Sequence, residues 1–349
     1  MKKPQYIAYV STYTRNNENG IRIYNVDAEN GRLSEREEIS IKNSSYLTIS
    51  HNQKYIYSIT DFGVEAFKME EDGGLSLINV ASINGMRGCY ISTDYTDKYM
   101  FVAGYHDGKI TVLALNEDGS IGPITDEVFH QGMGSISERT SRPHVRCVKM
   151  TRDNKYLLAT DSGIDHVKIY RFDKNNGTIK PVDVIRCEQE SGPKYVKFTK
   201  DGKFAYVINE MNSTIVAYSY KEVNGYPEFE KIQKISTLNN YHAQDAAACA
   251  MKFSYDTKYL FCSNAGDNSV GCFEVNSETG ELTKKFVLPI SGTYPKDIAI
   301  FPDNKHLVSL NHESNTMTFF TVDLEKNIIV MNGREMKVDK GNTVTILKL

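Results

Sequence analysis

One pattern of apolar and polar positions recurs six times along this chain. Each copy is a short apolar segment, a turn with Asp or Asn, a lysine, and a second apolar segment. The turn lysines are spaced 44, 57, 48, 55 and 47 residues apart, and the copies align without gaps. A repeat of this length is typical of β-propellers, whose blades are four-stranded sheets. The turn lysines are Lys54, Lys98, Lys155, Lys203, Lys258 and Lys305.

Each repeat continues with two more predicted strands. The third alternates apolar and polar residues, as in KITVL (109–113) and HVKIY (166–170), and a turn that usually contains Gly follows. The fourth strand is more polar, as in LTKKFVLP (282–289). Strands joined by short turns predict a β-meander. We expect the longer connections, 118–141 and 221–247, to be loops between blades on one face.

The two ends of the chain complete the count of blades. QYIAYVST (5–12) resembles a second strand without a first, and the segments 20–27 and 33–40 supply the third and fourth strands. NTVTILKL (342–349) is a lone strand that could supply the missing one. Closure in this way leaves no open sheet edge. We therefore predict an all-β, seven-bladed β-propeller as a single domain over residues 1–349, closed by both terminal strands in one blade.

Composition excludes several classes of partner. The net charge of −3 provides no basic field for nucleic acid or an anionic membrane. The N-terminal apolar run is five residues long, too short for a signal peptide, and no segment is long enough to span a membrane. Six cysteines without a CxxC motif favour a reduced, cytoplasmic chain. No metal-ligand spacing or phosphate-binding glycine motif is present, so we expect no metal and no cofactor. The oligomeric state stays open.

The polar positions near the start of the first strands point to a site. Counted from the turn lysine, positions −7 and −5 are apolar almost throughout, and strict alternation would put −9 on the same face. Yet −9 is Arg146, Lys194 or Lys296 in three repeats. In an antiparallel hairpin, position +7 lies beside −9, so Glu210 should contact Lys194. These residues and His144 should surround one mouth of the ring.

Each of these residues also has a purely structural interpretation. Lys194 and Glu210 could form only a cross-strand ion pair, His144 could be a satisfied structural histidine, and Lys296 could be a rim residue. The convergence of His, Arg, Lys and Glu from separate blades favours a ligand site. The asparagines at position +6 are more typical of turn formers than of ligands; they are Asn209, Asn264 and Asn311.

Several motifs, each at its blade position, resemble one known family. They are STYT (11–14), RPHVRCV (142–148), SGPKYVKF (191–198), YVINEMNSTIVAY (206–218) and SNAGDNSVGCFEV (263–275). The chain is similar, over essentially its whole length, to the seven-bladed propeller lactonases. That family includes 6-phosphogluconolactonase and the fungal carboxymuconate lactonizing enzymes. The resemblance implies hydrolysis of a sugar lactone or a reversible lactone-forming cycloisomerisation.

The resemblance also implies a set of site residues. The family pattern has a PHxH stretch, an Arg in GPRH, the Glu of NE and an Arg in NRG. Here His144 matches the first His and Glu210 matches the Glu. Exchanged positions carry Arg146 for the second His, Lys194 and Tyr195 for the Arg and His of GPRH, and Ala265 for the Arg of NRG.

The expected function is therefore hydrolysis of the ester bond of a sugar lactone, phosphorylated or not. Glu210 would act as general base with His144 sharing the proton, while Lys194 and Arg146 would stabilise anionic groups. Two alternatives stay open: a propeller that binds an anionic sugar or a protein partner without turnover, and a muconate-type lactonizing isomerase. Further expected substrate-binding residues are Arg142, Tyr195, Lys296, His312 and Tyr105.

Overall fold

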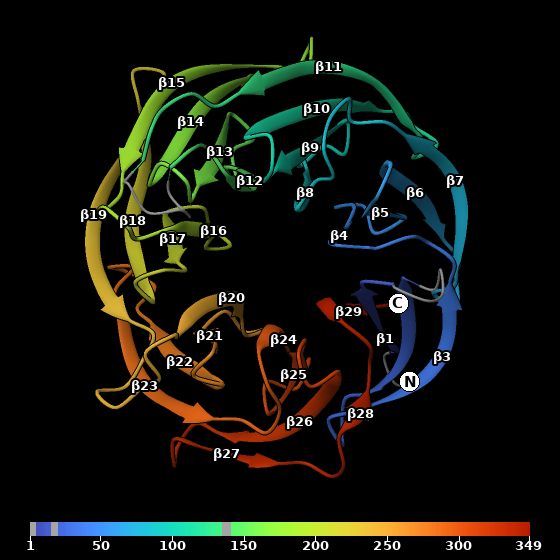
Figure 1. Ribbon diagram of the computed structural model, residues 1–349, viewed down its shortest axis with the longest axis vertical. Coiled ribbons are helices and arrows are strands. Elements are labelled where there is room, and N and C mark those ends of the chain that lie inside the picture. Colours follow the sequence, from blue (N-terminus) through green and yellow to red (C-terminus); the bar gives the residue numbers. More distant parts are fainter. Residues whose placement is uncertain (1–4, 15–19, 135–140) are drawn as a thin grey trace.

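The fold is a ring of seven sheets around a central axis (Figure 1). A computed structural model describes residues 5–14, 20–134 and 141–349. These residues form 29 strands and no helix, so none of them lies in a helix able to cross a membrane. The axial region enclosed by the seven innermost strands is hereafter the central channel.

Each blade has its innermost strand at the axis and its most polar strand at the rim, and the strands below run in that order. Blade 1 contains β29 (Gly341–Lys348), β1 (Tyr6–Thr12), β2 (Ile21–Asp27) and β3 (Arg32–Ile39). Blade 2 contains β4 (Leu47–Ile49), β5 (Tyr55–Thr60), β6 (Gly63–Met69) and β7 (Leu75–Ala81). Blade 3 contains β8 (Tyr90–Thr93), β9 (Tyr99–Gly104), β10 (Lys109–Leu115) and β11 (Ile121–Phe129). Blade 4 contains β12 (Val145–Met150), β13 (Tyr156–Asp161), β14 (His166–Asp173) and β15 (Thr178–Arg186).

Blades 5 to 7 follow the same order. Blade 5 contains β16 (Pro193–Phe198), β17 (Phe204–Asn209), β18 (Thr214–Val223) and β19 (Tyr226–Ser236). Blade 6 contains β20 (Ala247–Phe253), β21 (Tyr259–Ala265), β22 (Ser269–Val275) and β23 (Leu282–Pro289). Blade 7 contains β24 (Pro295–Ile300), β25 (His306–Asn311), β26 (Thr316–Asp323) and β27 (Ile328–Met331), and β28 (Met336–Lys337) also pairs with β26.

The C-terminal strand closes the ring as predicted. β29 is the innermost strand of blade 1 and pairs antiparallel with β1, with Val344 opposite Val10 and Thr345 opposite Tyr9. Both valines are fully buried. The pairing covers the inner edge of β1, which would otherwise expose unpaired backbone groups.

The repeat motif builds the turn between the two inner strands of blades 2 to 7. The residue before each turn lysine has a positive φ, from Gln53 (φ 58) to Asn304 (φ 58), and in blade 5 it is Gly202. Asn, Asp and Gly tolerate this conformation best. In five of the six turns a Ser, Thr or Asp four residues before the lysine accepts the backbone N–H after it, as Thr151 does from Tyr156 at 3.1 Å. In blade 7 Asp303 accepts instead, from His306 at 3.2 Å. All six turn lysines are exposed, as expected for turn residues.

Strict alternation in the first strand is wrong, because a β-bulge interrupts it. In β16, Pro193 pairs with Asn209 and Tyr195 with Ile208, so Lys194 is an extra residue between them. β12 and β24 have the same irregularity at Arg146 and Lys296. Bulges re-aim side chains and occur next to active sites. The apolar −7 and −5 residues pack between blades, whereas Lys194 is free to turn toward the residue at +7.

The two long connections are also more regular than predicted. β11 occupies nine residues of 118–141, and β18 and β19 extend into an unusually long hairpin that fills most of 221–247. Loops remain between blades 3 and 4, where residues 135–140 lie outside the described residues, and between blades 5 and 6, where the loop spans residues 237–246.

Candidate functional site

Glu210 is the centre of the predicted cluster. It follows the last residue of β17, and its carboxylate accepts Lys194 Nζ on Oε1 at 2.7 Å and Arg146 Nη2 on Oε2 at 2.8 Å. The two cations come from neighbouring blades, β16 and β12. The Glu210 side chain is 19% exposed, so water or a ligand can reach it. The predicted contact of Lys194 with Glu210 is therefore confirmed, and Arg146 joins the same carboxylate.

Burial and charge set the protonation of the two cations. Burial alone would lower the pKa of Lys194, but Cys249 and the Glu210 carboxylate outweigh it and the pKa lies above its usual value. Lys194 Nζ also lies 3.4 Å from Cys249 Sγ. Burial opposes the charge of Arg146 too, and Glu210 raises its pKa in compensation. Both groups therefore stay cationic at neutral pH.

His144 presents one nitrogen as a hydrogen-bond acceptor. Its Nδ1 lies 2.7 Å from the Tyr105 carbonyl oxygen, which can only accept, so Nδ1 carries the proton in the neutral ring and Nε2 bears the lone pair. The imidazole stacks on the Tyr105 ring at 4.2 Å, and the Arg146 guanidinium lies 5.1 Å from that ring's centre. Tyr105 thus joins His144 to the Glu210 cluster.

A buried pair behind His144 was not predicted. His130 Nδ1 lies 2.6 Å from Asp161 Oδ2, and both side chains are fully buried. Asp161 Oδ1 accepts the backbone N–H of His144 at 2.7 Å and of Gly163 at 3.0 Å. Burial lowers the pKa of His130, so the ring is neutral and donates from Nδ1. The signal in the sequence is that Asp161 stands at +6, where three other repeats have Asn.

Lys296 and His312 form the opposite part of the mouth. The Lys296 ammonium lies 5.0 Å from the centre of the Tyr13 ring, and Arg87 lies 4.7 Å from it. The His312 ring contacts the edge of Tyr13 at 6.0 Å. Burial, followed by repulsion from Lys194, lowers the pKa of Lys296 to about 8. Tyr13 and Arg87 were missed by the positional argument, although Tyr13 lies in the STYT motif.

Of the remaining predicted residues, Tyr195 adjoins the Glu210 cluster, because Lys194 Nζ lies 5.6 Å from the centre of its ring, whereas Arg142 does not. Tyr195 is part of a tyrosine cluster inside the channel, with its ring centre 5.5 Å from Tyr90 and 6.4 Å from Tyr46. Burial raises the pKa of Tyr195 well above its usual value, so its hydroxyl stays protonated. Arg142 is exposed, and within the described residues no hydrogen bond or ion pair joins its side chain to the Glu210 cluster.

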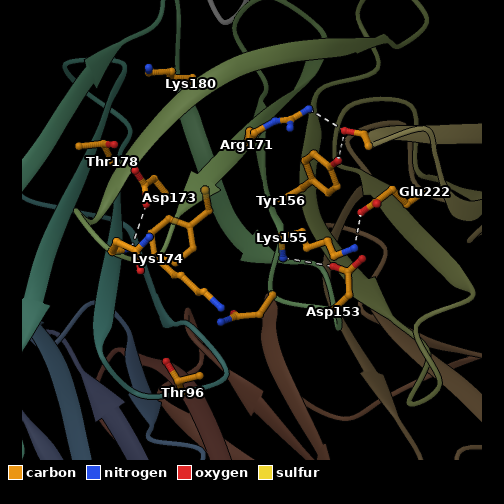
Figure 2. A pocket seen from close by; sticks show the side chains of 14 residues that line it. Thr96, Asp153, Lys155, Tyr156, Arg171, Asp173, Lys174, Thr178, Lys180 and Glu222 are labelled. Atoms are coloured by element: carbon orange, nitrogen blue, oxygen red, sulfur yellow. Dashed lines mark hydrogen bonds and ion pairs between the residues drawn. The ribbon is translucent and has the colours of Figure 1, made fainter.

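A separate concavity lies away from the Glu210 cluster, at the turns of blades 3 to 5 (Figure 2). It has a volume of about 740 Å³. Most of its charges already have partners: Lys155 pairs with Glu222 at 2.6 Å, and Arg171 donates to the Gly225 carbonyl at 2.6 Å. In Figure 2 these side chains connect the long β18–β19 hairpin to blade 4. The groove is therefore a seam between blades, and the Glu210 cluster is the better candidate site.

No metal site competes with this assignment. The described residues contain no group of three or more His, Cys, Asp or Glu side chains placed to hold a metal ion. None of the six cysteines forms a disulfide. The chemistry available at the Glu210 cluster is that of a carboxylate, two cations and an imidazole.

Comparison with known proteins agrees with this architecture. Residues 7–346 match the family model described as "Lactonase, 7-bladed beta-propeller". The 6-phosphogluconolactonase of Bacillus subtilis is 30% identical, with 92% of each chain aligned. A candidate 6-phosphogluconolactonase of Bacteroides fragilis has a crystal structure that superposes with a TM-score of 0.89 at 30% identity, covering 99% of each chain. An uncharacterised protein of Staphylococcus saprophyticus is 31% identical over 94% of this chain and 95% of its own length. The chain therefore belongs to the seven-bladed β-propeller lactonase family.

Proposed function

We propose that this protein hydrolyses the ester bond of a sugar lactone at the mouth formed by Glu210, Arg146, Lys194 and His144. The observation that supports it best is the partly exposed Glu210 carboxylate, held at 2.7 and 2.8 Å by cations from two blades. Family membership and the names of the relatives support a lactone as substrate. The six free cysteines support a reducing compartment, the cytoplasm.

The proposed reaction needs a base, an oxyanion stabiliser and an acid. Glu210 takes a proton from a water molecule while the oxygen of that water attacks the lactone carbonyl carbon. Lys194 and Arg146 stabilise the negative charge that develops on the carbonyl oxygen. When the ring C–O bond breaks, the proton returns to the leaving alkoxide, directly or through His144 Nε2. The net change is addition of one water to give a hydroxy acid.

Residues around this centre would bind the rest of the substrate. Lys296, whose pKa of about 8 keeps it largely cationic at neutral pH, would attract a carboxylate or phosphate of the substrate. Arg142, Tyr105, His312 and Tyr195 are the further proposed contacts. Binding that depends on Lys296 should weaken as the pH rises through about 8, because the ammonium loses its charge.

The test is a panel of aldonolactones, with and without phosphate, followed by proton release against the spontaneous background. We expect Glu210→Gln to lower kcat by roughly 10²–10⁴, the usual effect of a positioned acid–base group. The fold should survive, because Gln keeps the volume and can still accept from Lys194. Glu222→Gln, which removes an exposed ion pair at the groove of Figure 2, is the matched control and should keep the wild-type rate.

Lys194→Met provides a second arm of the same experiment. Loss of this cation should raise KM for a phosphorylated lactone by about tenfold or more and change KM for a neutral lactone least. A folded Glu210→Gln protein with an unchanged rate would remove Glu210 as the base.

A propeller that binds an anionic sugar or a protein partner without turnover is the second candidate. The full pairing of Glu210 favours it, because both carboxylate oxygens already accept a cation. The exchange of a family arginine for Ala265, which is buried, removes one further cation from the mouth. No rate above background for any lactone in the panel would favour this function.

A further inference from the structure

A second group of cations lies inside the channel, separate from the Glu210 cluster. Position −6 of three consecutive repeats is lysine: Lys149 on β12, Lys197 on β16 and Lys252 on β20. These are neighbouring innermost strands (Figure 1). Beyond the bulge, strand alternation places −6 on the same side as −8, and a cavity inside the channel is lined by residues of both positions. The three lysines therefore converge on the axis.

Three tyrosines separate these lysines from the mouth. Tyr46, Tyr90 and Tyr195, all at −8, lie with ring centres 4.5 to 6.4 Å apart and line one side of that cavity. Lys197 and Lys252 line it as well. The tyrosine cluster is therefore a partition between the Glu210 cluster and the three lysines.

The positive charge in this part of the channel is only partly compensated. Asp297 of β24 accepts Lys252 Nζ at 3.1 Å, and the same oxygen accepts Thr343 Oγ1 at 2.8 Å and the Val344 backbone N–H at 2.9 Å. Within the described residues, the ammonium groups of Lys149 and Lys197 have no hydrogen-bond or ion-pair partner. Lys296 of the mouth lines the same cavity, so one carboxylate faces these three lysines and Lys296.

Confinement makes this excess costly. Burial, with repulsion from Lys252 and Lys149, lowers the pKa of Lys197 to about 7. Burial also lowers the pKa of Lys149. Both lysines are half-buried. A confined charge without a counterion is unfavourable where screening is poor, and an anion beside the lysines would offset that cost.

We propose that a halide-sized monovalent anion binds in the central channel, beside Lys197 and the Lys252–Asp297 pair, with Lys149 on the neighbouring inner strand as a further cation. The cavity at Lys197 has a volume of about 10 Å³, which suits one small particle and excludes a phosphate. Chloride is the physiological ion of this class. The inference rests on the channel lysines alone and does not depend on lactone hydrolysis at the mouth.

Water is the competing occupant. Asn342 lines the same cavity, and its buried Oδ1 has no hydrogen-bond partner among the described residues. A water molecule could donate to this oxygen, which an anion cannot do. An experiment must therefore distinguish an anion from a water at this position.

Bromide is the probe. Crystals soaked in bromide should show an anomalous difference peak next to Lys197, and in solution bromide should raise the midpoint of thermal unfolding in a saturable way at fixed ionic strength. Methanesulfonate replaces bromide to keep the ionic strength constant. It is suited to this use because it is too large for the cavity. Lys197→Met should weaken the bromide response at least tenfold, and Lys149→Met should weaken it less. Lys258→Met, an exposed turn lysine, is the matched control and should respond like the wild type.

Two outcomes would overturn the proposal. The first is a water peak without anomalous signal beside Lys197 in bromide-soaked wild-type crystals, a result that does not require any variant to fold. The second is an equal response to bromide and to sulfate, which would show general screening of the lysines rather than a site of limited size.

Discussion

A single exchange at position +6 distinguishes blade 4 from blades 5, 6 and 7. In blades 5 and 6 this position is Asn209 and Asn264, whose amide nitrogens donate across the following turn while their Oδ1 atoms have no hydrogen-bond partner among the described residues. In blade 4 it is Asp161, whose two oxygens accept three N–H groups from His130, His144 and Gly163. The charged residue thus fixes the start of β12, which carries Arg146.

Asp161→Asn tests this positioning role. The amide cannot accept from three N–H groups, so we expect the free energy of unfolding to fall by about 1.5–3 kcal/mol, the usual contribution of a buried hydrogen bond to a charged group. The protected His130 Nδ1 proton should also disappear from the proton NMR spectrum or shift. Asp339→Asn, in an exposed turn, is the control for stability. Wild-type stability and an unshifted His130 proton in Asp161→Asn would contradict the assignment.

Neighbouring blades are joined by a recurring tyrosine contact. The hydroxyls of Tyr9, Tyr57 and Tyr206 donate to glycine carbonyls in the outer turn of the next blade at 2.8, 3.2 and 2.9 Å. The three tyrosines are fully buried, and each glycine has a positive φ that a β-carbon would strain. In all three cases the tyrosine hydroxyl donates to a buried turn carbonyl, so these three interfaces depend on polar contacts as well as on apolar area.

Removal of one of these hydroxyls should have a measurable cost. We expect Tyr206→Phe to lower the free energy of unfolding by about 1 kcal/mol, because the Gly280 carbonyl stays buried without its donor. Denaturant titration measures this change, and Tyr57→Phe should behave alike. Tyr241→Phe, at a 98% exposed position, should be neutral. A loss in Tyr241→Phe as large as in Tyr206→Phe would refute the contact as the cause.

At the scale of the whole molecule, charge is distributed unevenly. The chain is acidic, with a net charge of −3, yet the channel carries cationic side chains on both sides of the tyrosine partition. Glu210 faces Arg146, Lys194 and Lys296 at the mouth, and Asp297 faces three lysines beyond the partition. The axis is therefore positive inside an acidic protein, and anions are drawn to it.

The free energy of unfolding should depend on pH because of the confined charge on Lys197. The pKa of Lys197 is about 7 in the folded protein and 10.5 as its ordinary value, so between these pH values the unfolded chain holds the extra proton. Lys197→Met should therefore stabilise the fold most below pH 7, by roughly 1–3 kcal/mol in halide-free buffer, and progressively less up to pH 10.5. The groups that face Lys197 are Lys252, Lys149, Cys147 and Asp297. Unfolding free energies measured from about pH 6 to pH 10 check this, and a pH-independent difference between the two proteins would contradict it.

The sequence by itself determined the architecture and one contact of the site. The repeat specified the number of blades, because each copy contains the hydroxyl or carboxylate and the left-handed residue that build its turn. The lone strand at 342–349 specified closure, because an unpaired inner edge on 5–12 had to be covered. Antiparallel pairing was enough to place Lys194 beside Glu210, since both belong to one hairpin.

Only the tertiary structure decided how separate blades combine. A bulge at position −9 redirects Arg146, Lys194 and Lys296. The local sequence pattern does not predict this bulge, because the extra residue leaves the apolar spacing of −7 and −5 unchanged. The second cation on Glu210 comes from another blade, 64 residues away. The group of channel lysines depends in the same way on the ring, because residues 48 and 55 positions apart become neighbours only when seven inner strands close around one axis. Local chemistry encodes each blade, whereas the electrostatics of the channel arise from side chains that meet only after closure.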